Sequence, residues 1–318
     1  MNATRTLRVV GVTRSTLLAA GLGACTVQGI VADSVPMDAG FRVDATMNGA
    51  PLRMCVDTGS PTSLLSLATA QRHGFPLCAT QATITDSTGL AQPGAGLLDL
   101  ALHIGSTTFR GQGICLRTAD SVGDGLVGYP VLSVGAWLFD APGERLHMAP
   151  ADDAERLVGD NGLRVVARLS LGADEWRPRV TVRLDDARDV ALLLDTGAGR
   201  TSLRADVVDA LQLPAGEALA KQRADESAAA LAEDLRRQGL EDVKVTVSPG
   251  NGKSIGLHGV EQTSSVHHLR RLSFGGRTFE DLVVTSCADE GLLGRDVLGR
   301  CVWLLHGPRR ELWLLEKQ

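Results

Sequence analysis

The chain contains an internal repeat, and this repeat constrains its fold more than any other feature. Residues 41 to 64 contain a strand of alternating apolar residues, a polar turn, a second apolar strand and then Asp57-Thr58-Gly59. Residues 178 to 203 have the same order and lead to Asp195-Thr196-Gly197. A chain of 318 residues that repeats such a unit is long enough for two homologous lobes, each with its own core.

The similarity continues downstream of both turns. Three later segments of the first half recur in the second: Gly105 to Phe109 as Gly275 to Phe279, Gly125 to Leu132 as Gly291 to Leu298, and Pro142 to Leu146 as Pro308 to Leu312. Gly128 and Gly294 are 166 positions apart, whereas the two aspartates are 138 apart. The second half therefore carries extra residues between Asp195 and Gly275.

The extra residues contain a predicted helix. Residues 217–244 are rich in Ala, Glu, Arg and Leu and predict one amphipathic helix, which is either a solvated surface helix or a lid or partner-docking element. The segment Pro249 to Gly252 predicts the turn of a hairpin, and the first half has its counterpart near Thr83 to Gln92, turning around Asp86 to Gly89. Shorter helices are expected after the two repeated turns, at Leu64 to His73 and Leu203 to Leu211.

A repeated Asp-Thr-Gly turn has a clear chemical use. One such triplet is weak evidence, because an Asp that caps a helix before a Thr-Gly turn would look the same. Two triplets in equivalent positions after apolar strands are a strong signal. Two partly buried carboxyl groups in contact resist double ionisation and share one proton. The ionised group of Asp57 and Asp195 can then activate water, and the protonated one can polarise a carbonyl.

The other residues of the two turns support this arrangement. Gly59 and Gly197 allow the backbone to turn closely beneath the carboxyl groups. Thr58 and Thr196 can form hydrogen bonds to the opposite half and so lock the two turns together.

With these motifs the chain resembles the retropepsin and pepsin-like aspartic peptidases. Each lobe of those enzymes supplies an Asp-Thr/Ser-Gly turn and, later, two hydrophobic residues and a glycine that pack behind it. The matching segments are Leu126-Val127-Gly128 and Leu292-Leu293-Gly294. The resemblance covers residues from about 41 to the end, apart from the helical insertion.

This resemblance implies an all-β, bilobal acid-protease fold of the retropepsin type, with two β-barrel-like lobes, short helices and one helical insertion. It implies a first lobe at 41–150, a linker at 151–162 and a second lobe at 163–318. The catalytic residues would be Asp57 and Asp195, in loops supported by Thr58, Gly59, Ser60, Thr196, Gly197 and Ala198. A polypeptide substrate would bind extended in the cleft between the lobes of a monomer, without a cofactor or a metal ion.

The chain departs from the family pattern at several positions. Its only tyrosine, Tyr129, is not in a flap, so the flaps are expected to be Gly-rich hairpins. Because Tyr129 and Pro130 follow Gly128 where Arg295 and Asp296 follow Gly294, the helix after Gly128 is expected to begin differently. We expect Arg295 and Asp296 to make structural contacts.

The two turns also differ from one another. Ser60 follows the first triplet, whereas Ala198 follows the second. A hydroxyl group near a carboxylate stabilises its charged form. We therefore hypothesise that Asp57 is the ionised partner and Asp195 the protonated one.

The N-terminus predicts export. Arg5, Arg8 and Arg14 precede a short apolar stretch, which makes residues 1–24 an expected export signal that is too short to span a bilayer. The stretch ends in Leu22-Gly23-Ala24-Cys25, which resembles a bacterial lipoprotein cleavage box. That resemblance implies lipidation of Cys25, a tether at 25–40 and a periplasmic or cell-envelope location. The alternative is a plain secretory signal with an incidental cysteine.

Other features restrict the partners of the protein. No two cysteines have metal-ligand spacing, and no Lys/Arg run forms a basic face for nucleic acid. After export, Cys78 could pair with Cys115, and Cys287 with Cys301. Cys55 is placed in an apolar strand and is expected to be a buried small residue rather than a nucleophile.

Two functions remain open from the sequence. The first is an aspartic endopeptidase, which the two carboxyl groups favour because a binding module does not need them. The second is a catalytically weak peptide-binding or scaffolding protein on the same fold.

Overall fold

The computed structural model describes residues 7–9, 26–27, 30–85, 91–116, 123–172, 177–237, 253–255, 261–287 and 290–318. The expected lipidation site Cys25 and most of the expected export signal lie outside these ranges. Strands dominate, and the few helices are short apart from one, so the predicted all-β class is confirmed.

The first half of the chain forms a barrel, here called the first barrel. Its strands close in the order β4 (Arg42–Met47), β5 (Ala50–Val56), β10 (Gly125–Val127), β6 (Leu64–Ser66), β9 (Thr107–Leu116) and β8 (Ala91–Ile104), because β8 pairs with both β4 and β9. Three further strands extend this sheet: β7 (Leu77–Thr85), β1 (Leu7–Val9) and β2 (Thr26–Val27).

The second half forms a second barrel with the equivalent strand order. It runs β14 (Arg179–Leu184), β15 (Arg188–Leu194), β21 (Leu292–Leu293), β16 (Ser202–Arg204), β20 (Arg277–Cys287) and β19 (Val266–Phe274). Each barrel thus contains a short strand, β10 or β21, that lies parallel to the strand leading to its Asp-Thr-Gly turn.

A six-stranded sheet joins the two halves, which the sequence did not reveal. Its order is β13 (Leu163–Ser170), β23 (Glu311–Lys317), β22 (Val302–His306), β11 (Ala136–Asp140), β12 (Arg145–Ala149) and β3 (Asp33–Pro36). The central antiparallel pair has Leu138 opposite Leu304, two residues that the repeat makes equivalent because they are 166 positions apart. A local two-fold axis therefore passes through this pair.

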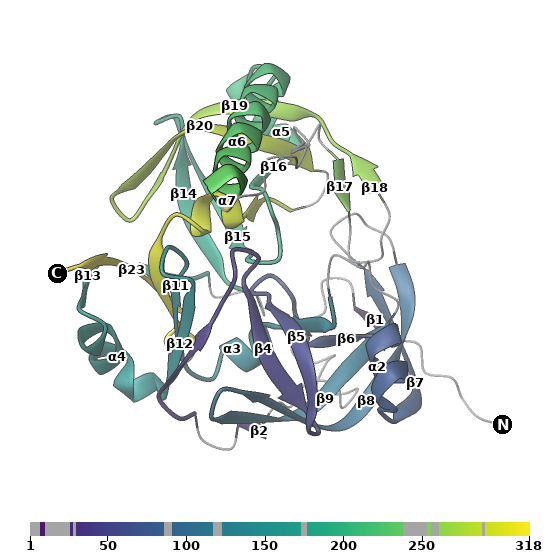
Figure 1. Cartoon of the computed structure of the whole chain (residues 1–318). Coiled ribbons are helices and arrows are strands. Elements are labelled where there is room, and N and C mark those ends of the chain that lie inside the picture. Colours follow the sequence, from purple (N-terminus) through teal and green to yellow (C-terminus); the bar gives the residue numbers. More distant parts are fainter. Residues whose placement is uncertain are drawn as a thin grey trace.

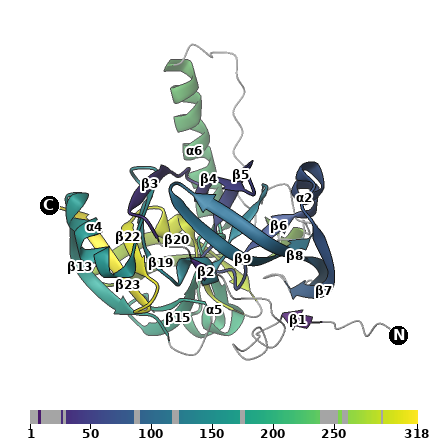
Figure 2. The ribbon, with the colours of Figure 1, turned by 90° about the horizontal axis from the view of Figure 1, so that it is seen from below.

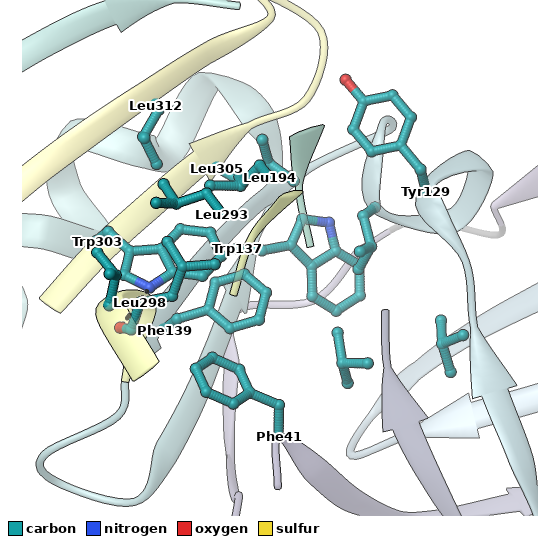
Figure 3. Packing of buried hydrophobic residues seen from close by; sticks show 14 of the residues in the cluster. Phe41, Tyr129, Trp137, Phe139, Leu194, Leu293, Leu298, Trp303, Leu305 and Leu312 are labelled. Carbon is teal, nitrogen blue, oxygen red and sulfur yellow. Dashed lines mark hydrogen bonds between the residues drawn. The ribbon is translucent and has the colours of Figure 1, made fainter. Parts of the chain in front are cut away.

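The core is continuous across the two halves. Phe139 of β11 stacks on Trp303 of β22 with ring centroids 4.0 Å apart, and Phe41 lies against both rings. Figure 3 shows these aromatic rings together with Leu194 and Leu293, which come from the strands behind the second turn. The buried apolar surface of the joining sheet therefore continues to the base of both turns.

The helices are α2 (Leu67–His73), α3 (Tyr129–Leu132), α4 (Ala154–Asp160), α5 (Ala205–Leu211), α6 (Glu217–Arg237) and α7 (Arg295–Leu298), with a 3₁₀ turn, η2, at Ala151–Asp153. The two helices expected after the repeated turns begin three and two residues late, because β6 and β16 occupy their first residues and complete the barrels. The expected linker at 151–162 is largely helical, and Leu157 and Val158 of α4 pack on the joining sheet.

The predicted insertion helix is confirmed as α6, whereas residues 238–244 lie outside the described ranges. Figure 2 shows α6 extending away from the body of the molecule. Within the described parts of the chain, no helix is both long and apolar enough to cross a membrane.

The first-half hairpin is confirmed in its strands. β7 pairs with β8 up to Thr85 opposite Ala91, and the predicted turn between them is outside the described residues. In the second half, β17 (Lys253–Ile255) pairs with β18 (Glu261–Thr263), whereas Pro249 to Gly252 are outside the described residues. Figure 1 shows β7, β17 and β18 on the side of the molecule opposite β13 and β23.

Neither suggested disulfide is present. Cys115 and Cys301 are both buried thiols, and burial raises the pKa of each to about 11. Cys55 is also a buried thiol, as expected for a core residue.

Candidate active site

The two repeated turns lie at equivalent strand ends in the two barrels. Asp57 follows β5, and its N–H donates to Val127 O of β10 at 2.9 Å. Asp195 follows β15, and its N–H donates to Leu293 O of β21 at 3.1 Å. The parallel pairs β5–β10 and β15–β21 therefore fix where each strand ends and each aspartate begins.

The turns approach one another so closely that only glycine fits at their centres. A Cβ atom on Gly59 would lie 2.5 Å from Cγ of Asp195, and one on Gly197 would lie 2.6 Å from Oδ2 of Asp57. Each glycine therefore lies against the carboxyl group of the opposite half. A hydrogen bond joins the carboxyl groups of Asp57 and Asp195.

The two buried threonines hold the turns together. Thr58 Oγ1 donates to Leu194 O at 2.6 Å, and Thr196 Oγ1 donates to Val56 O at 2.6 Å. Each hydroxyl oxygen also accepts from the N–H of the opposite threonine, at 3.0 and 3.1 Å. Thr58 and Thr196 thus form the reciprocal hydrogen bonds expected from the sequence.

Each carboxyl group accepts two backbone N–H groups through its Oδ1. Asp57 accepts from Gly59 at 2.9 Å and from Ser60 at 3.1 Å. Asp195 accepts from Gly197 and Ala198, both at 2.9 Å. These hydrogen bonds leave the Oδ2 atoms without a backbone donor and fix the orientation of both groups.

The surrounding protein raises the pKa of both carboxyl groups. Burial raises the pKa of Asp57 most, and the neighbouring Asp195 raises it further. Burial also raises the pKa of Asp195, but the N–H groups of Ala198 and Gly197 and the hydrogen bond from Asp57 oppose this effect. The pair therefore shares one proton.

The hypothesis that Asp57 is the ionised partner was drawn from the Ser60 hydroxyl, and the structure does not support that argument. The Ser60 hydroxyl donates to Thr62 O at 2.7 Å and therefore does not donate to the Asp57 carboxylate. The residue supports its own loop, and the argument for an ionised Asp57 loses its basis.

The two hydrophobic-Gly segments lie behind the turns, as expected. The N–H of Gly128 donates to Ser63 Oγ and that of Gly294 donates to Thr201 Oγ1, both at 3.1 Å. Leu126 and Val127 pair with β5, and Leu292 and Leu293 pair with β15. Sequence reasoning missed Ser63 and Thr201 as loop supports, although a hydroxyl residue stands six positions after both aspartates.

The residues after the two glycines begin short helices in the same way. Helices α3 and α7 both start immediately after their glycine, so the expected difference at Tyr129 is wrong. Asp296 accepts from the N–H and Oγ1 of Thr201, and Arg295 Nη1 donates to Gly40 O of the first half at 2.8 Å. The structural contacts expected of Arg295 and Asp296 are present.

Asp57 and Asp195 remain partly open to solvent, whereas their threonines are fully buried. The buried threonines hold the two turns rigidly, while the carboxyl groups themselves are accessible to solvent. A general acid and base require both properties. Within the ranges that the structure covers, no three His, Cys, Asp or Glu side chains are grouped so that they could hold a metal ion.

Residues 43–131 match the model of a family described as aspartyl protease. This range contains the first turn and the Leu126-Val127-Gly128 segment, and the match supports an aspartic peptidase family. No curated protein matches the chain significantly in sequence.

Proposed function

Taking the aspartyl protease match of residues 43–131 as a premise, we propose that the protein is an endopeptidase with one catalytic dyad, Asp57 and Asp195. The observation that carries the proposal is the reciprocal fit of the two turns, in which each glycine faces the carboxyl group of the other half. A pair joined by one proton can act as base and acid at the same time.

In this mechanism a water molecule lies between the carboxyl groups and the scissile carbonyl. Asp195, the ionised partner, takes a proton from the water while the water oxygen attacks the carbonyl carbon. Asp57 donates its proton to the carbonyl oxygen, which yields a neutral tetrahedral diol. Asp195 then gives its proton to the departing nitrogen, Asp57 takes a proton from one hydroxyl of the diol, and collapse breaks the C–N bond and restores the dyad.

The substrate of this mechanism is an extended polypeptide. The two hairpins β7–β8 and β17–β18 lie on the same side of the molecule, opposite the β13 and β23 side of the joining sheet (Figure 1). We assign them the role of flaps that pair with a strand-like peptide. Because one chain carries both half-sites, a monomer is sufficient.

We also propose that the enzyme acts after export, in the periplasm or cell envelope, with Cys25 as the lipid attachment point. The basic residues and apolar run before Cys25 support this location. The mass of the mature N-terminus would test it: a diacylglyceryl group on Cys25 supports the anchor, and an unmodified cysteine or an uncleaved leader contradicts it.

Cleavage of an unfolded protein between about pH 3 and 8 tests the peptidase activity, because carboxyl dyads are tuned within this range. A peptide whose scissile bond is replaced by a hydroxyl-bearing tetrahedral carbon should inhibit, since it resembles the transition state. We expect cleavage that this peptide blocks. Binding of the peptide without turnover of any substrate would instead favour the peptide-binding function.

A further inference from the structure

The two half-sites differ in the residue that lies opposite the aspartate on the neighbouring strand. In the second barrel, the Leu194 N–H donates to Pro178 O at 2.8 Å, which extends the antiparallel β14–β15 register by one residue. The next pair in this register is Arg177 opposite Asp195. Directly opposed residues of an antiparallel pair project from the same face, and they are closest in a pair without hydrogen bonds, which this one is.

In the first barrel the same position holds a glycine. The Val56 N–H donates to Phe41 O at 2.8 Å, but Phe41 has a left-handed φ of 57° and its N–H donates to Asp38 O, so the strand pairing ends there and Gly40 lies in a turn. Two cations lie on this side: Arg42, and Arg295, whose Nη1 is hydrogen-bonded to Gly40 O. Asp57 therefore has no strand residue paired opposite it, whereas the continued β14–β15 register places Arg177 opposite Asp195.

An ion-pair cluster holds Arg177 in place. Its Nη1 lies 2.8 Å from Oε2 of Glu290, and its Nη2 donates to Oε1 at 3.1 Å. Arg179 contacts the same carboxylate. The Arg177 and Glu290 side chains are only 27% and 21% exposed, so solvent screens them incompletely. Two guanidinium groups and one carboxylate leave this cluster with a net positive charge beside Asp195.

We propose that Arg177 is a positioning residue that makes the two half-sites inequivalent, keeping the negative charge of the dyad on Asp195 and the shared proton on Asp57. This inference rests on the proposed function, because it specifies which aspartate activates the water. Arg177 acts through Asp195 and does not itself react.

Other charged and titratable groups also lie around the dyad. Among the described residues these groups are Arg42 and Cys55 of the first barrel, and Arg179, Glu290 and Arg295 of the second. The charge of Arg177 lowers the pKa of Asp195, in addition to the larger effects of the backbone N–H groups and Asp57. No cation is among the main causes of the pKa of Asp57, which burial and Asp195 set.

The test is a titration of the dyad in Arg177→Gln, Arg177→Lys, Arg179→Gln and Glu290→Gln. Carboxyl ¹³C NMR of the whole protein, labelled at aspartate, follows the dyad without requiring turnover. In Arg177→Gln the more acidic transition of the dyad should move up by roughly half a pH unit, since an opposite charge nearby has been lost. The acid limb of the kcat/KM profile should move with it.

The other variants separate charge from structure. Arg177→Lys should restore the wild-type transition, and Glu290→Gln should move it down, because it removes the anion that offsets Arg177. Arg179→Gln is the matched control, because it removes the same charge and loses the same partner, Glu290. Arg179 lies opposite Leu193, which is two residues away from Asp195 along the strand. Its shift should be clearly smaller.

Equal shifts in Arg177→Gln and Arg179→Gln, or no shift in a folded Arg177→Gln, would overturn the assignment. If the wild type cleaves no substrate but its dyad titrates as described, the proposed function fails and the electrostatic role of Arg177 stands. If the wild type cleaves a substrate and the dyad titrates identically in the wild type and Arg177→Gln, only the inference about Arg177 fails.

Discussion

At the scale of single residues, the hydroxyl groups of Thr58 and Thr196 explain why the turns contain threonine. Each Oγ1 donates to a carbonyl of the opposite half and accepts the N–H of the opposite threonine. Valine fills the same volume but satisfies neither bond. Serine keeps both bonds but loses a methyl group from a fully buried position.

We expect Thr196→Val to destabilise the protein by about 2–4 kcal/mol, because Val56 O and the Thr58 N–H lose their partner in the interior. Urea unfolding would measure this difference. Thr196→Ser is the control and should lose about 1 kcal/mol. Equal losses in the two variants would show that the hydroxyl group contributes nothing.

The residue scale also shows how far sequence reasoning extends. The positions of Asp57, Asp195, Thr58 and Thr196 follow from the repeat, because a repeated motif after equivalent strands must occupy equivalent places. The partner of the Ser60 hydroxyl could not be predicted, because it depends on where the Thr62 carbonyl points. Arg177 was missed for a related reason: its place opposite Asp195 appears only when the strand register is known.

At the scale of elements, the repeat predicted strands and hairpins better than helix boundaries. Leu64 to Ser66 and Ser202 to Arg204 form barrel strands because the neighbouring strands offer hydrogen-bond partners, which outweigh local helix preference. The segment 151–160 is helical because Leu157 and Val158 can pack on the joining sheet. Both outcomes depend on contacts with strands that are distant in the sequence, so they cannot be predicted from the local sequence alone.

The insertion helix α6 is attached to the second barrel by its first turns. Ala220 and Ala224 are buried one helical turn apart, and Ala220 packs with Val266 and Val283 of β19 and β20. Arg223 donates to Asp281 O beside this contact. These contacts are those of a surface helix that is held to the barrel by a small apolar contact near its N-terminal end.

We expect Ala220→Glu to loosen α6, because a carboxylate would be placed against two buried valines at a cost of a few kcal/mol. Limited proteolysis should then cut α6 sooner than in the wild type. Ala218→Glu is the matched control, since Ala218 is exposed on the same helix. Indistinguishable cleavage of the two variants would contradict the packing described.

At the scale of the whole molecule, the joining sheet unites the two barrels. β11 and β22 pair along their full lengths around the Leu138–Leu304 axis, and the Phe139–Trp303 stack lies at their interface. The two carboxyl groups can meet because this shared sheet fixes the barrels relative to one another. The sequence contained the evidence in the 166-residue spacing, but the pairing of two equivalent strands across an axis required the structure.

The joining sheet also makes stability depend on pH. Burial lowers the pKa of His147 of β12 and of His306 of β22. The unfolded chain therefore binds protons at these histidines at a higher pH than the folded protein does. Stability should be fully present above the unfolded value of about 6.5 and should fall as the pH decreases below it.

We expect His147→Gln to flatten this dependence, because glutamine does not titrate. The free energy of unfolding in urea, measured at pH 7.5 and 5.5, should fall less between the two pH values than it does in the wild type. An unchanged difference would show that His147 is protonated equally in both states. His103→Gln, at a partly exposed histidine of the first barrel, serves as the control.

The measurement that tests the account most directly compares single-turnover cleavage by the wild type, Asp57→Asn, Asp195→Asn and the double variant, each checked for folding. If one dyad carries the chemistry, each single variant should lose activity by about 10³-fold or more, and the double variant should be no worse than either, since residues that act as a unit are not additive. If either single variant retains about half of the activity, or if the losses multiply in the double variant, the two aspartates act separately and the shared site is contradicted.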